Sequence, residues 1–121
     1  METSQNLNPT TELFKRDEFR KLLQPDKNYF VFFTATWCKY CHIAKPKVEQ
    51  YLNLLRGRNV KFEYLVLDAD QSGDIARFLK VKAYPTLLCI MENTIQDACV
   101  GGGEQDLKEF FNESYRKIQS K

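Results

Sequence analysis

Apolar residues along this chain follow two spacings that alternate with each other. Short runs of aromatic and β-branched residues predict strands, and stretches in which an apolar residue returns every three or four positions predict helices. Residues 11–14, TELF, are a further candidate for a short first strand. The spacing predicts, in chain order, helix 17–23, strand 29–35, helix 42–58, strand 60–68, helix 72–81, strands 86–91 and 94–100, and helix 104–118.

The second predicted helix, 42–58, is marked by one continuous apolar stripe that faces a core. Pro46 lies inside this stripe and is expected to kink the helix, because proline lacks an amide hydrogen. Gly57 is expected to close the helix as its C-cap. The stripe consists of residues 44, 48, 51, 52 and 55, and the last helix directs Leu107, Phe110, Phe111, Tyr115 and Ile118 inward.

The last two predicted strands lie close enough together to form a hairpin with its turn at residues 92–93. A regular hairpin about that turn places Cys89 opposite residue 96 and Cys99 opposite residue 86. Because side chains alternate along a strand, this pairing sends Cys89 and Cys99 to opposite faces of the sheet. Two cysteines so placed would neither bridge each other nor share a metal ion.

The order of the elements predicts the fold class. Alternating strands and helices require parallel strands with right-handed crossovers, and the closing hairpin adds an antiparallel pair. We therefore expect an α/β fold with a central mixed β-sheet flanked by helices on both faces. Strand 29–35 lies in the middle of this sheet, and Cys38 falls just beyond its carboxyl end, where α/β folds place their chemistry. Residues 1–10 are expected to be a flexible lead-in and residues 11–121 to form one domain.

Composition limits the function without naming it. The 121 residues carry a net charge of +2, with 43% hydrophobic and 28% charged residues, which is ordinary for a globular domain. This charge gives no reason to expect a nucleic acid or a membrane as partner, and we expect a monomer. The sequence has no signal-peptide pattern and no window of ~18 apolar residues. We expect a cytoplasmic, reducing location, where cysteines are catalytic, metal-binding or inert before they are a disulfide framework.

The candidate chemistry centres on Cys38 and Cys41, which follow the only tryptophan, Trp37. A C-x-x-C pair at a strand-to-helix junction places its first sulfur beside the unpaired amide groups that begin the helix. Those amides and the cation of Lys39 favour the thiolate and lower the pKa of Cys38. Cys41 lies one turn further along and is more shielded. We therefore interpret Cys38 as the attacking nucleophile and Cys41 as the resolving thiol.

Other interpretations of the cysteines are less favoured. A zinc site needs four ligands, and the remaining candidates, Cys89, Cys99 and His42, do not form a second C-x-x-C pair, so no metal is expected. A purely structural disulfide between residues 38 and 41 closes too short a loop to restrict the unfolded chain much. Cys89 and Cys99 are most simply small apolar residues in strands, and His42 is an exposed helix residue with some scope to tune its neighbour.

Several segments of the chain resemble the thioredoxin family. They are WCKYC at 37–41, Pro46 five residues later, LDADQ at 67–71, YPT at 84–86 and the glycine at 101 after the hairpin. The resemblance runs from about residue 11 to the C-terminus. It implies a thioredoxin fold and a thiol–disulfide oxidoreductase that reduces protein disulfides. It also implies no bound cofactor and an external electron donor, either thioredoxin reductase with NADPH or glutathione.

The resemblance further implies a cis peptide bond between Tyr84 and Pro85 that faces the cysteine pair. A cis bond before proline costs only about 0.5–1 kcal/mol. It turns the backbone of Tyr84 outward, where an extended substrate strand can pair with it. By the same resemblance, Trp37, Tyr40, Tyr84 and Gly101 surround the docking surface for protein substrates.

One departure from the family pattern concerns proton transfer. Many thioredoxins have a buried acid six residues before the first cysteine and a basic partner on a neighbouring strand. In this chain the two positions are Phe32 and Val66, which are apolar. Water or a substrate group would then take the proton of the resolving thiol. We expect slower resolution, or tuning by Lys45 or His42.

A second departure from the family pattern is Lys39-Tyr40 between the cysteines, where the best-known thioredoxins have Gly-Pro. Tyrosine next to the second cysteine resembles glutaredoxins. Because Lys39 stabilises the reduced form, we expect a more oxidising pair than in those thioredoxins. The sequence leaves three alternatives open: a disulfide oxidase or isomerase, a glutathione-linked glutaredoxin-like protein, and a binding adaptor whose cysteine pair is idle or regulatory.

Overall fold

The structure is a computed structural model that describes residues 19–21 and 23–120. Residues 19–21 are helical, within the helix expected at 17–23. The expected lead-in at 1–10 and the candidate strand at 11–14 lie outside the described residues, and so does the domain boundary between them.

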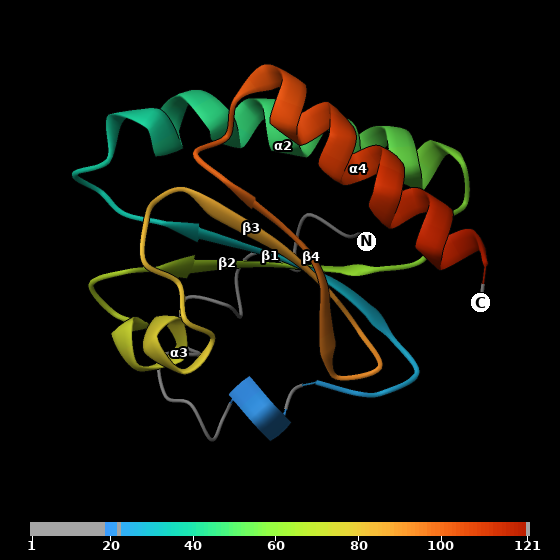
Figure 1. The fold of residues 1–121 in the computed structure, drawn as a ribbon, viewed down its shortest axis with the longest axis horizontal. Helices are drawn as coiled ribbons and strands as arrows, with labels where there is room; N and C mark the ends of the chain where they lie inside the picture. Colours follow the sequence, from blue (N-terminus) through green and yellow to red (C-terminus); the bar gives the residue numbers. More distant parts are fainter. Residues whose placement is uncertain (1–18, 22, 121) are drawn as a thin grey trace.

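The described chain builds one sheet with helices on both of its faces. Its elements are β1 (Asn28–Thr34), α2 (Lys39–Gly57), β2 (Glu63–Asp68), α3 (Gly73–Phe78), β3 (Thr86–Met91), β4 (Thr94–Val100) and α4 (Glu104–Gln119). The strand order is β2-β1-β3-β4; β1 is parallel to β2 and antiparallel to β3, and β4 is antiparallel to β3. Helices α2 and α4 cover one face and α3 lies on the other (Figure 1). The expected mixed sheet, with β1 in its interior, is confirmed.

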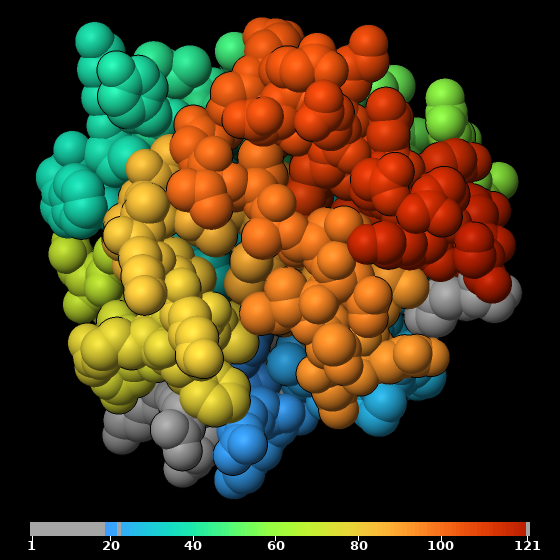
Figure 2. Space-filling model, in the orientation of Figure 1, coloured from blue at the N-terminus to red at the C-terminus, as the bar shows by residue number. Residues whose placement is uncertain are grey.

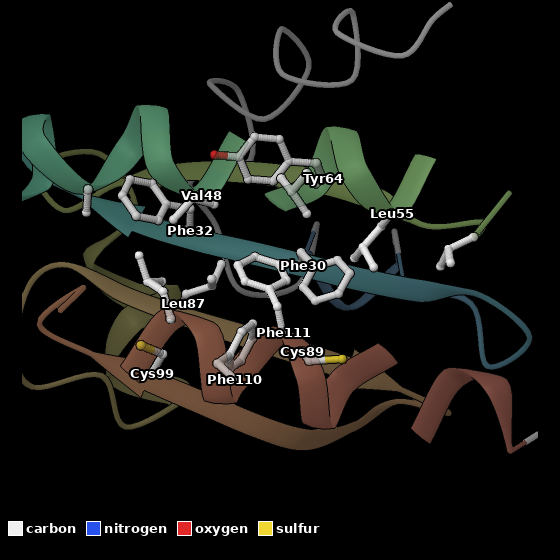
Figure 3. Close-up of a cluster of buried hydrophobic side chains, with 14 of the residues drawn as sticks. Phe30, Phe32, Val48, Leu55, Tyr64, Leu87, Cys89, Cys99, Phe110 and Phe111 are labelled. Carbon is white, nitrogen blue, oxygen red and sulfur yellow. The ribbon is translucent and has the colours of Figure 1, made fainter. Parts of the chain in front are cut away.

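Strand β1 is apolar from Tyr29 to Phe33 because both of its sides are covered. Phe30 and Phe32 belong to the core cluster under α2 and α4 (Figure 3), whereas Val31 and Phe33 belong to the cluster on the α3 side. All four side chains are at most 1% exposed. Each face of the sheet therefore has its own core, and β1 joins the two.

Helix α2 runs from Lys39 to Gly57 with Pro46 inside it, so this proline does not end the helix. The expected C-cap at Gly57 is wrong. The residue with left-handed backbone is Asn59, with φ of 63°. The amide of Asn59 donates to the carbonyl of Arg56 at 3.0 Å, and the next amide, of Val60, reaches back to Leu55 at 3.0 Å. Asparagine tolerates this conformation, so it closes the helix here in place of glycine.

The hairpin of β3 and β4 turns at residues 92–93 as predicted, but its register differs from the prediction. A bulge beyond Cys89 shifts the pairing by one residue, so Cys89 lies opposite Asp97 and Cys99 lies opposite Leu87. Cys89 and Cys99 therefore point to the same face and share one core cluster, which corrects the expectation of opposite faces. Figure 3 shows their sulfur atoms directed away from each other.

The last two helices differ from their predictions in detail. Helix α3 ends at Phe78, before the expected end at residue 81, because Lys80 adopts φ of 63°. In α4 the predicted inward residues are buried or half-buried, and Ser114 is buried beside them. In the part of the chain that the structure describes, no helix is both long and apolar enough to cross a membrane.

Candidate active site

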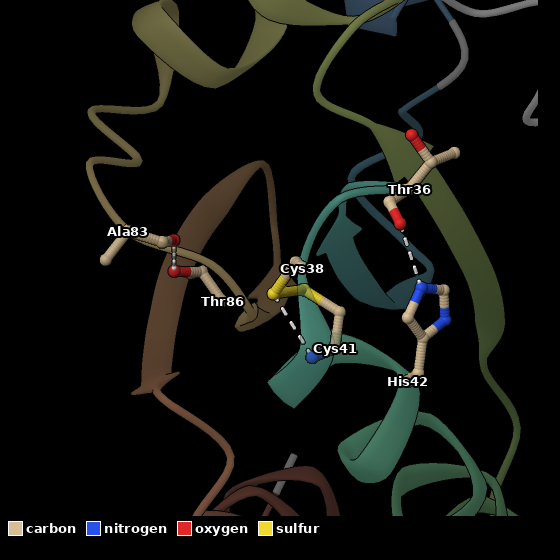
Figure 4. The surroundings of a disulfide bond; sticks show 6 residues. All are labelled: Thr36, Cys38, Cys41, His42, Ala83 and Thr86. Atoms are coloured by element: carbon tan, nitrogen blue, oxygen red, sulfur yellow. Dashed lines mark hydrogen bonds between the residues drawn. A yellow bond between two sulfur atoms is a disulfide. The ribbon is translucent and has the colours of Figure 1, made fainter.

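Cys38 is the N-cap of α2, one position before the first helical turn in which the sequence placed it. Its backbone is extended, with φ of −99° and ψ of 106°. Its amide donates to the carbonyl of Ala35 at 3.1 Å, and its sulfur accepts a hydrogen bond from the amide of Cys41 at 3.2 Å (Figure 4). The sulfur thus occupies the place of a capping oxygen, which normally satisfies an amide at the start of a helix.

Cys38 and Cys41 form a disulfide, with 5.3 Å between their Cα atoms (Figure 4). Cys41 is completely buried, whereas Cys38 keeps 7% of its surface exposed. A partner can therefore reach the sulfur of Cys38 more readily than that of Cys41. The pair lies at the start of α2, whose side chains, in teal, protrude at the upper left edge of the molecule in Figure 2.

The electrostatic surroundings of Cys38 favour a negative charge. The first turn of α2 contains no acidic side chain, and its first helical residue is Lys39. The unpaired amides of this end carry the positive end of the helix dipole. When the disulfide is reduced, a thiolate on Cys38 is the group that can balance these charges.

The inner wall of the site is apolar. Ala69 and Tyr84 pack against the cluster that Ala35 forms with the two cysteines. Deeper in the core, Phe32 pairs with Val66 across β1 and β2, and Phe32 is 1% exposed. The two positions that hold an acid and its basic partner in many thioredoxins are therefore part of the hydrophobic core in this chain.

The peptide bond between Tyr84 and Pro85 is cis, as the resemblance implied. The carbonyl of Pro85 accepts a hydrogen bond from the amide of Gly101 at 2.8 Å, which ties the end of β4 to this turn. Sequence reasoning singled out Gly101 and missed its neighbour. Gly102 has φ of 68°, and a Cβ atom on it would lie 2.7 Å from the Cβ of Ala44 and 3.3 Å from Pro85. The triplet of glycines was the available signal.

Two aromatic side chains stand at the outer rim of the site. Trp37 and Tyr40 are each 66% exposed. The ring of Trp37 meets Tyr84 edge to face, with 5.8 Å between their centroids, and its Nε1 donates to Asp70 at 3.4 Å. Asp70 is held in turn by its amide, which donates to the carboxylate of Asp68 at 2.8 Å. The sequence pointed to LDADQ without assigning this contact to it.

The surroundings of Tyr84 keep its phenol protonated. Burial raises the pKa of Tyr84, and the nearby carboxylates of Asp68 and Asp70 act in the same direction. A neutral ring is therefore presented to the cysteine pair. This ring shields the buried side of the pair without adding a charge to it.

The structure brings together most of the residues that the sequence singled out. Tyr84 packs against the cysteine pair and meets the ring of Trp37, and Gly101 is bonded to Pro85. Lys39 and Tyr40 are exposed in the first turn of α2, beside Cys38. Cys89 and Cys99 lie in a different core cluster from Cys38 and Cys41. Among the described residues, no three His, Cys, Asp or Glu side chains are grouped so that they could hold a metal ion.

The fold and the cysteine pair define a thiol–disulfide oxidoreductase of the α/β class. Residues 10–113 match the thioredoxin family. The chain is 30% identical over 98 residues to a thioredoxin of Coprinus comatus, covering 81% of this chain and 91% of that protein. It is 29% identical over 99 residues to thioredoxin-1 of Saccharomyces cerevisiae, covering 82% and 92%. The X-ray structure of Fasciola hepatica thioredoxin superposes with a TM-score of 0.72 at 27% identity, covering 84% of this chain and 96% of that one.

The chain belongs to the thioredoxin family. It is a thiol–disulfide oxidoreductase with a redox-active cysteine pair, and its reaction is the reduction of protein disulfides. Proteins of this family act without a bound cofactor on disulfide-containing substrates, and a reductase restores their dithiol.

Proposed function

We propose that Cys38 is the nucleophile of this reaction and Cys41 the resolving thiol. The observation that carries the assignment is the position of Cys38 as the N-cap of α2, where it keeps 7% of its surface exposed while Cys41 behind it is fully buried. The thiolate of Cys38 attacks one sulfur of a substrate disulfide and forms a mixed disulfide, releasing the other substrate sulfur as a thiolate. Cys41 then loses its proton and attacks Cys38. The substrate leaves as a dithiol and the pair becomes the disulfide.

We propose that Trp37, Tyr40, Tyr84 and Gly101 form the surface on which a protein substrate docks. Two of these aromatic rings are largely exposed beside the nucleophile, and aromatic side chains are common anchors of binding surfaces. The backbone of Tyr84, whose side chain packs against the cysteine pair, would pair with an extended substrate segment. This pairing would hold the substrate disulfide in line with the attacking sulfur.

We propose thioredoxin reductase with NADPH as the electron donor, with glutathione as the alternative. The thioredoxins of Coprinus comatus and Saccharomyces cerevisiae that match most of this chain support the first donor. We also propose that the protein is cytoplasmic and that it is a monomer. Sedimentation or size-exclusion chromatography tests the oligomeric state, because a monomer of this chain has a mass of 14.2 kDa.

Insulin reduction, measured with each donor in turn, tests the proposed function. We expect turnover with thioredoxin reductase and NADPH, no turnover for Cys38→Ser, and a trapped mixed disulfide for Cys41→Ser. Cys89→Ala is the matched control, because this thiol lies in the core beneath α2 and α4 and not in the pair. A Cys41→Ser protein that captures substrate through another cysteine would reject the assignment of Cys38.

A further inference from the structure

His42 makes a hydrogen bond that neither its sequence position nor the family assignment explains. It is the only histidine of the chain, it follows Cys41 directly, and it is exposed. Its ring folds back along the outside of α2, and Nε2 lies 3.1 Å from the carbonyl oxygen of Thr36 (Figure 4). Because a carbonyl only accepts, Nε2 must carry the hydrogen and donate it.

This contact ties the start of α2 to the loop that carries the tryptophan. The backbone amide of His42 donates to the carbonyl of Cys38 at 3.4 Å, while its side chain binds the carbonyl of Thr36. One residue thus reaches both neighbours of Trp37. The remaining backbone hydrogen bond of the loop runs from the amide of Cys38 to Ala35 at 3.1 Å.

The ring of Trp37 is not held firmly by its own contacts. It is 66% exposed, its hydrogen bond to Asp70 is long at 3.4 Å, and it meets Tyr84 only by an edge. A ring with so few contacts depends on the backbone beneath it for a fixed position. The bond from His42 to Thr36 restrains the peptide unit that leads directly into Trp37.

We propose that His42 is a positioning residue that fixes Trp37 in its docking orientation. This inference rests on the proposed role of Trp37 in binding protein substrates. A docking side chain that is ordered before the partner arrives does not lose its freedom on binding, so affinity improves. The bond requires a donor at the place of Nε2 and does not require a charge.

Two substitutions separate the donor from the imidazole. His42→Gln places an uncharged amide donor at nearly the same distance from the backbone, and His42→Met keeps the length of the side chain without any donor. Both residues are good helix formers, so α2 is retained. Each pre-reduced protein is mixed with insulin or with bis(hydroxyethyl) disulfide, a substrate too small to cover Trp37, and its rate of oxidation is followed against disulfide concentration.

With insulin, His42→Met is expected to raise the half-saturating concentration by about three- to tenfold, the cost of ordering one side chain, with little change in the maximal rate. The rate with the small disulfide stays unchanged, and His42→Gln behaves like the parent protein. The fluorescence anisotropy of Trp37, the only tryptophan, falls in His42→Met and recovers in His42→Gln.

Two results would overturn the proposal. Equal insulin kinetics and equal anisotropy in all three proteins would show that the bond does not position Trp37. If both variants lost the same fraction of their oxidation rate with insulin and with the small disulfide, the imidazole would act on the reactivity of the cysteine pair and not on the position of Trp37. A parent protein that oxidises with neither disulfide would instead reject the proposed function, while the anisotropy would still report on the positioning of Trp37.

Discussion

Lys39 and Cys38 meet at the positively charged end of α2, where single residues decide the redox chemistry. Lys39 is the first helical residue, and a cation there opposes the helix dipole. The first turn offers no acidic side chain in compensation. A thiolate on Cys38 would balance both the cation of Lys39 and the positive end of the helix dipole, whereas the uncharged disulfide balances neither. We therefore expect Lys39 to stabilise the reduced form of the pair.

Replacing Lys39 with Glu should make the pair less oxidising. The change reverses a charge beside the thiolate, worth about 1 kcal/mol at an exposed helix end, so the reduction potential should fall by about 20 mV. Titration against glutathione mixtures, with alkylation of the reduced thiols, measures this shift. Lys39→Gln should give a smaller fall, since it removes the charge without reversing it. A potential that is unchanged in both variants would contradict the electrostatic role of Lys39.

The backbone of Lys80 is strained. It ends α3 with φ of 63°, a conformation that costs roughly 1–2 kcal/mol for a residue with a side chain. The amide of Lys80 donates to Arg77 and the amide of Val81 reaches back to Ala76, so the strained position closes the helix. The closure is kept because it satisfies two carbonyls at the helix end.

Lys80→Gly should raise the free energy of unfolding by about 0.5–1 kcal/mol. Glycine adopts this backbone conformation freely, although its greater freedom in the unfolded chain offsets part of the gain. Urea denaturation followed by circular dichroism measures the change. Lys82→Gly is the control, because its φ is not positive and the substitution should give no gain. Equal effects at the two positions would mean that the left-handed backbone is not the cause.

At the scale of the elements, the bulge in β4 has a packing consequence. The bulge places Asp97 opposite Cys89, and the carboxylate of Asp97 contacts α4. There Asp97 accepts hydrogen bonds from Lys117 at 2.8 Å and from Ser114 at 3.1 Å. Lys117 also donates to the carbonyl of Gln96 at 3.1 Å. Gln96 is the extra residue of the bulge. A partly buried polar cluster therefore attaches α4 to the edge of the sheet.

Asp97→Asn should lower the free energy of unfolding by about 2 kcal/mol. The substitution leaves the ammonium of Lys117 without its ionic partner in a site where the side chain of Asp97 is only 15% exposed, and bonds to charged groups are worth about 1.5–3 kcal/mol. Urea denaturation is again the measurement. Glu113→Gln breaks the exposed ion pair with Arg116 on the same helix and should cost less than about 0.5 kcal/mol. Similar losses in both variants would contradict the special role of the cluster.

The helices and strands differ in how well the sequence predicted them. The strands and α4 follow from apolar spacing, because two covered faces and one helical stripe leave clear patterns in the sequence. The bulge beyond Cys89 leaves no such pattern, and it reversed the face assigned to Cys99. The end of α2 at Asn59 was missed for a related reason, since glycine is only the commonest residue for that backbone.

The candidate site shows the same division. The spacing of Cys38 and Cys41 at a strand-to-helix junction pointed to the chemistry, because the pair acts through local geometry at a helix start. The cis bond before Pro85 was expected only from the resemblance to the thioredoxin family. The contact of Trp37 with Asp70 joins segments far apart in the sequence, and no local pattern encodes it. No local pattern marks Gly102 either, because it is required by Ala44 and Pro85, which pack against it from distant parts of the sequence.

At the scale of the whole molecule, Gly102 is the point where three segments meet. It follows β4, its backbone packs against Pro85, and its missing side chain leaves room for Ala44 of α2. The hydrogen bond from the amide of Gly101 to the carbonyl of Pro85 holds two of these segments together, the end of β4 and the turn at Pro85. The helix that carries the cysteines and the turn that faces them are thus fixed to one another through a close backbone contact.

Gly102→Ala should therefore affect both stability and reaction. Its new Cβ would lie 2.7 Å from the Cβ of Ala44, which forces a shift, and its φ of 68° disfavours any side chain. Overpacking costs about 1–3 kcal/mol, and we expect a loss of about 3 kcal/mol in the free energy of unfolding. Gly101→Ala shares the positive φ, at 93°, but its Cβ would meet nothing within 4 Å, so its loss should stay near 1 kcal/mol.

The difference between the two variants isolates the contact from the backbone strain that they share. If the contact aligns the pair with the turn of Pro85, Gly102→Ala also lowers the rate of insulin reduction by more than Gly101→Ala at a temperature where both proteins are folded. Because α2 must move to admit the new methyl group, the cysteines move with it relative to the docking turn. Equal stability and equal rates in the two variants would mean that the loop yields without disturbing α2, and the site would then owe its geometry to the disulfide segment alone.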